Sequence, residues 1–150
     1  MKLIQPNCRI QFTAEDLDFI ADTLGKSNRD HNILLDLLRD DETRDLILDE
    51  EALFRSLLEQ RGCLRVSNRF YFYIIVRNVL KSAGIENLEV ADYLAELLTH
   101  YSQSEQMQCR IPGQAGPMDY FFEMLAALNT ADERTSFYIR AHIGNHSLFL

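Results

Sequence analysis

The chain has 150 residues, which corresponds to about one domain. Hydrophobic residues make up 47% of it, and it has only 6 glycines and 3 prolines, so disordered, collagen-like and linker-dominated chains are excluded. There are 15 lysines and arginines against 23 aspartates and glutamates, and the net charge of −8 disfavours binding to nucleic acid or to an anionic membrane. The longest apolar run, Phe70–Val76, is far shorter than a membrane span.

The first residues and the cysteines indicate a cellular compartment. Met1–Pro6 carry one charge, but no apolar segment of signal-peptide length follows them, so a secretory signal is not expected. Cys8, Cys63 and Cys109 are odd in number and lie far apart, which is typical of reduced thiols rather than of a disulfide framework. We therefore expect an acidic, cytoplasmic protein without a membrane segment.

Capping signals and the helical spacing of apolar residues predict an all-α fold. Thr13 and Asp16 form a capping-box pattern, Gly25 is placed to end the first helix, and acidic residues precede two later helices. In chain order, the predicted helical segments are 13–25, 32–38, one beginning at 40–42, 49–62, 67–81, 87–101, 118–128 and 132–150, with an extended connector at 63–66. From these eight segments we expect about seven helices, since boundaries read from one sequence err by several residues.

The segment near residues 67–82 is predicted to be the central helix of an irregular bundle. Apolar residues surround nearly its whole circumference between Phe70 and Leu80, which is typical of a helix buried on all sides. Phe70–Val76 alone also fits a buried strand, but the length of the segment favours a helix that ends at Gly84.

The C-terminal third is predicted to contain a long loop and an unfinished helix. Residues 102–117 are polar and include two Pro-Gly or Gly-Pro pairs, so we expect a loop of unusual length. The final helix is still apolar at Ser147–Leu150 and has no stop signal. We expect a single helical domain over residues 1–150 that either continues past Leu150 in the native chain or buries its end in a partner.

Three strings carry a resemblance to a known group of proteins. They are Phe70–Arg77, Gly84-Ile85 together with Val90–Tyr93, and Arg140–Leu150. Together they resemble a family of uncharacterised bacterial helical proteins, over roughly residues 70–150. The resemblance implies a bacterial protein whose relatives extend past this C-terminus, and it implies no activity.

Two histidines of the final helix are candidate metal ligands. His142 and His146 lie about 40° apart on a helical wheel, in an apolar sector, and the i, i+4 spacing can bring two imidazoles to one metal. Ile143 stands where a zincin has its catalytic glutamate, and no third ligand is evident. Buried neutral histidines and histidines of a pH-sensitive interface are the alternatives.

Four further residues are candidates for ligand binding: Arg77, Tyr93, Arg140 and Asn145. Arg77 lies on an otherwise apolar helix, where it forms either a structural ion pair with Asp92 or an anion-binding site. No nucleophile elbow, phosphate loop, dinucleotide fingerprint or calcium loop is found in the sequence.

The sequence leaves two functions open. The first is a non-catalytic helical module that self-associates, plausibly as a homodimer, or holds a protein partner through its aromatic surface and final helix. The second is a small-molecule or metal-binding protein, conceivably an enzyme, with a pocket between the central and final helices. We favour the first, and expect no cofactor and no nucleic-acid or membrane partner.

Overall fold

The fold was obtained as a computed structural model, which describes residues 3–60, 65–102 and 121–149, with Phe121, Phe122 and Phe149 described by their backbone alone. The chain is all-α, as predicted: the described residues form eight α-helices and no strand. The predicted loop at 103–117 and the start of the helix predicted at 118 lie outside the described residues. No helix in the described part is both long and apolar enough to cross a bilayer.

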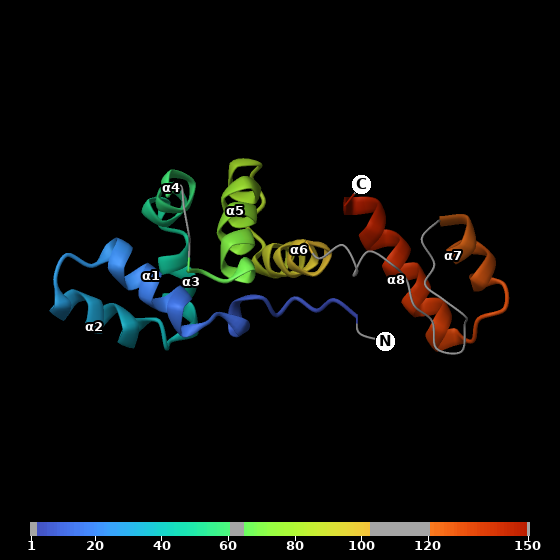
Figure 1. Cartoon of the computed structure of the whole chain (residues 1–150), viewed down its shortest axis with the longest axis horizontal. Helices are drawn as coiled ribbons and strands as arrows, with labels where there is room; N and C mark the ends of the chain where they lie inside the picture. Colours follow the sequence, from blue (N-terminus) through green and yellow to red (C-terminus); the bar gives the residue numbers. More distant parts are fainter. Residues whose placement is uncertain (1–2, 61–64, 103–120, 150) are drawn as a thin grey trace. The chain divides into compact units, whose positions relative to one another are not determined.

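Figure 1 shows the helices in chain order. They are η1 (Arg9–Gln11), a single 3-10 turn, and the α-helices α1 (Ala14–Leu24), α2 (Asn28–Leu37), α3 (Asp41–Leu48), α4 (Glu51–Glu59), α5 (Asn68–Ser82), α6 (Leu88–Tyr101), α7 (Phe121–Leu128) and α8 (Glu133–Phe149).

The helix boundaries follow local capping chemistry. The predicted starts and stops are found at Thr13, Gly25, Asp40, Ser67, Asn87 and Asp132, where a side-chain oxygen accepts a backbone N–H at each start. The helix predicted over Asn32–Leu38 begins earlier, at Asn28, because the hydroxyl of Ser27 caps it by accepting the amide of Asp30. Gly84 has a φ of 79°, so it takes the left-handed conformation that ends α5.

One buried carboxylate joins the starts of α1 and α5. Asp16 accepts the amide of Thr13 at 2.8 Å and completes the capping box of α1. The same carboxylate accepts the amide and the hydroxyl of Ser67, each at 2.6 Å, and that hydroxyl in turn caps α5. Ser67, the N-cap residue of α5, is thereby fixed to α1, although Asp16 and Ser67 are 51 positions apart in the sequence.

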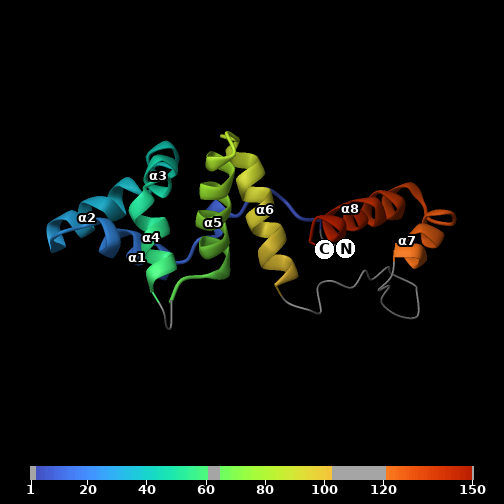
Figure 2. The ribbon, with the colours of Figure 1, turned by 90° about the horizontal axis from the view of Figure 1, so that it is seen from above.

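The contacts divide the chain into two compact units (Figure 2). We call Gln5–Glu96 the N-terminal unit, and Met1–Ile4 with Leu97–Leu150 the C-terminal unit. The division passes through α6. This division does not test the expectation of a single helical domain over residues 1–150, which stays a prediction.

The core of the N-terminal unit lies against α5. Phe70 and Tyr73 are fully buried there, and Phe12 packs edge-on against both rings. The expectation that α5 is buried on all sides is wrong in detail, because the Val79 side chain is 59% exposed. One side of α5 therefore forms the core, while its C-terminal turns reach solvent.

The C-terminal unit contains the helical hairpin of α7 and α8. Met124 and Ala127 of α7 and Ile139 of α8 form its buried cluster. Leu128, Ala131, Tyr138 and Ile143 pack around this cluster. The hairpin thus buries one side of α8 and leaves the other side available.

Candidate functional site

The two candidate histidines lie in a cluster of aromatic rings inside the C-terminal unit. His142 and His146 are both buried, and their ring centroids are 6.0 Å apart. Tyr101, from the end of α6, places its hydroxyl 3.3 Å from Nδ1 of His142 and stacks on His146 at 6.3 Å. Tyr138 stacks on His142 at 6.4 Å. The helical spacing therefore brings the imidazoles together, as predicted, and surrounds them with tyrosines.

This cluster does not have the ligands of a metal centre in the described residues. No group of three or more His, Cys, Asp or Glu side chains in residues 3–60, 65–102 and 121–149 is placed to hold a metal ion. Tetrahedral zinc sites need at least three protein ligands. The geometry therefore supports a packing role for His142 and His146 better than a metal site.

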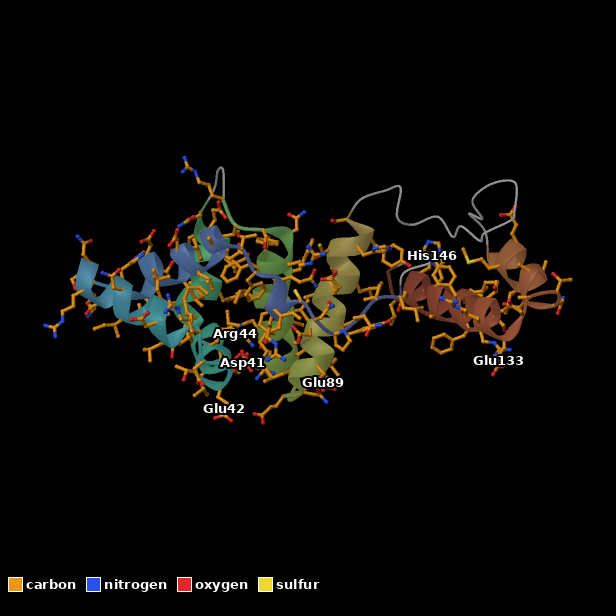
Figure 3. The ribbon with its side chains drawn as sticks, turned by 90° about the horizontal axis from the view of Figure 1, so that it is seen from below. Asp41, Glu42, Arg44, Glu89, Glu133 and His146 are labelled. Carbon is orange, nitrogen blue, oxygen red and sulfur yellow. The ribbon has the colours of Figure 1, made fainter. Side chains whose placement is uncertain are left out.

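The other two candidates on α8 lie on different sides of the helix. Asn145 is buried next to His146 in the sequence, whereas Arg140 is exposed. Figure 3 shows α8 with Glu133 at its start and His146 close to its end. Because Asn145 and Arg140 face different surroundings, they do not converge on one ligand.

Arg77 is buried in the N-terminal unit, where it is fully engaged by other residues. Its Nε and Nη2 atoms donate to the two carboxylate oxygens of Asp49 at 2.8 and 3.0 Å. Its Nη1 atom donates to the carbonyl of Glu86 at 3.0 Å. A guanidinium with this bidentate pairing links α5 to the α3–α4 junction and the start of α6, which favours a structural role. Tyr93, the remaining candidate, is half-buried on α6 in the same unit.

The ion pair expected between Arg77 and Asp92 is not formed, because each residue has a different partner. Asp92 is bonded by the Nε and the backbone amide of Arg9, both at 3.0 Å. Arg9 also reaches Asp45 of α3 at 2.6 Å, so it ties the N-terminal segment to α3 and α6. Arg9 lies far from these partners in the sequence, and no local pattern indicates the pairing.

Burial and ion pairing oppose each other at these carboxyl groups. Burial raises the pKa of Asp49, but the hydrogen bonds and charge of Arg77, with a smaller contribution from Lys81, outweigh it and hold the pKa below its usual value. Burial also raises the pKa of Asp92, and here the bonds from Arg9 do not fully compensate, so the pKa stays above its usual value. The Arg77–Asp49 and Arg9–Asp92 pairs therefore differ. Ion pairing outweighs burial in setting the pKa of Asp49, whereas burial outweighs ion pairing in setting the pKa of Asp92.

A surface hollow of about 710 Å³ lies between α1 and α4. Three carboxylates of α1, those of Glu15, Asp18 and Asp22, line one wall. The side chains of Asp18 and Asp22 are mostly exposed, and His31 of α2 lies 3.7 and 3.0 Å from them. The wall is therefore a solvated acidic surface rather than a set of groups converging on a ligand.

Among the described residues of the C-terminal unit, the side of α8 opposite the buried Ile139 carries large exposed apolar side chains. The side chains of Phe137 and Leu148 are 62% and 67% exposed, and Gly144 between them is exposed as well. A Cβ atom placed on Gly144 would meet no neighbouring side chain or other element within 4 Å in the described structure. With Ala141, these residues fall within a sector of about 60° on a helix of 100° per residue. We call Phe137, Ala141, Gly144 and Leu148 the open face of α8.

The sequence singles out α8 through His142 and His146, and both lie on its buried side. The spacing of Phe137, Ala141, Gly144 and Leu148 is visible in the sequence, but which side of α8 is buried is not.

Comparison with protein-family models, with curated proteins and with solved structures gave no match.

Proposed function

We propose that this chain is a non-catalytic helical interaction module that acts in the bacterial cytoplasm and binds a protein partner through the open face of α8. The observation that carries the proposal is the exposure of Phe137 and Leu148 on one side of α8, whose opposite side is buried. Large apolar side chains aligned on an exposed face are typical of interaction surfaces. Gly144, between them, leaves room for the close approach of a partner's backbone.

The architecture around α8 supports a docking role. Ile139 is fully buried against α7, and His142, Asn145 and His146 are buried on the neighbouring turns. A helix held in this way presents its open face with little freedom to lose on binding, which lowers the entropic cost of association. The cytoplasmic location is supported by the spacing of the three cysteines, and the bacterial origin by the sequence resemblance described above.

The alternative of a ligand or metal pocket has less support. Arg77 already uses three nitrogens in bonds to Asp49 and Glu86. His142 and His146 have no third metal ligand placed beside them in the described residues. A pocket that uses these groups would have to displace existing contacts, whereas docking on α8 would displace none that the structure describes.

Photo-crosslinking along α8 tests the proposal. A benzoyl-phenylalanine replaces, one at a time, Phe137, Ala141 and Leu148 of the open face, or Leu46 and Val79, which are exposed apolar residues of the N-terminal unit, as controls. We expect an intermolecular adduct, identified by peptide mass spectrometry, at the first three positions and not at the controls. Crosslinks confined to the same chain, or equally strong at the controls, would contradict docking on this face.

A further inference from the structure

We draw no further inference here: the strongest candidate, the exposed apolar face of α8 around Phe137 and Leu148, carries nothing beyond the function proposed above, because nothing in the described part of the structure shows what covers it.

Discussion

Replacing Arg77 by methionine should strongly destabilise the N-terminal unit. Met keeps much of the apolar stem but removes both hydrogen bonds to Asp49 and the bond to the carbonyl of Glu86. Lys81 remains near the carboxylate, with its Nζ atom 3.6 Å from Asp49. Removing one partner of a buried ion pair costs about 3–5 kcal/mol. Because the Asp49 side chain is 21% exposed and Lys81 relieves part of its charge, we expect a loss of about 2–3 kcal/mol.

A double-mutant cycle isolates the pair. We expect the loss in the free energy of unfolding of Arg77→Met/Asp49→Asn to be about 1–2 kcal/mol smaller than the sum of the losses in the two single variants. The reason is that the double variant leaves no uncompensated carboxylate. Urea unfolding followed by far-UV circular dichroism measures each free energy of unfolding. Arg55→Met is the matched control, because the Arg55–Glu51 pair is mostly exposed on α4 and should be worth less than about 1 kcal/mol. Additive losses, or an Arg77→Met variant as stable as Arg55→Met, would refute the stabilising role of the Arg77–Asp49 ion pair.

Three further predictions follow from the described contacts. The Arg77–Asp49 pair holds the pKa of Asp49 below its usual value, so its stabilising effect should be present above about pH 4 and lost as the pH falls below it; stability curves of the wild type and Asp49→Asn should therefore converge in acid. The buried hydroxyl of Tyr73 has no hydrogen-bond partner in the described structure, so Tyr73→Phe should leave the free energy of unfolding unchanged or raise it by up to about 1 kcal/mol, and a clear loss would reveal a partner. Gly84→Ala should cost about 1–2 kcal/mol because of the positive φ, whereas Gly144→Ala, with open space around it in a helix, should gain about 0.5–1 kcal/mol; thermal melts that reverse this order would contradict the backbone assignment.

The helices could be predicted because their boundaries depend on nearby residues. The capping box of Thr13 and Asp16 and the cap at Asp132 involve residues only three positions apart. Such contacts form within one turn of a helix, so their sequence pattern is nearly sufficient. The bonds from Asp16 to Ser67 are different, because they join residues 51 positions apart and no spacing rule indicates them.

The candidate site was less predictable because burial decides which side of a helix is available. In the sequence Arg77 stands out on an apolar helix, but its partner Asp49 reads only as an acidic helix start. On α8, His142 and Phe137 are equally visible in the sequence, and only the folded structure shows that His142 is buried, beside Tyr101 of α6, whereas Phe137 is exposed. Tertiary packing, rather than residue type, therefore decides which side of α8 is exposed.

The carboxylate of Asp16 also makes two helix ends open and close together. Fraying of α1 at Thr13 frees the oxygens that hold Ser67, and release of Ser67 removes the hydroxyl that accepts the amide of Phe70 at the start of α5. The first turns of α1 and α5 should therefore exchange their amide hydrogens as one cooperative unit, although most of the N-terminal unit separates them in the sequence. In Asp16→Asn the two turns should exchange at independent rates.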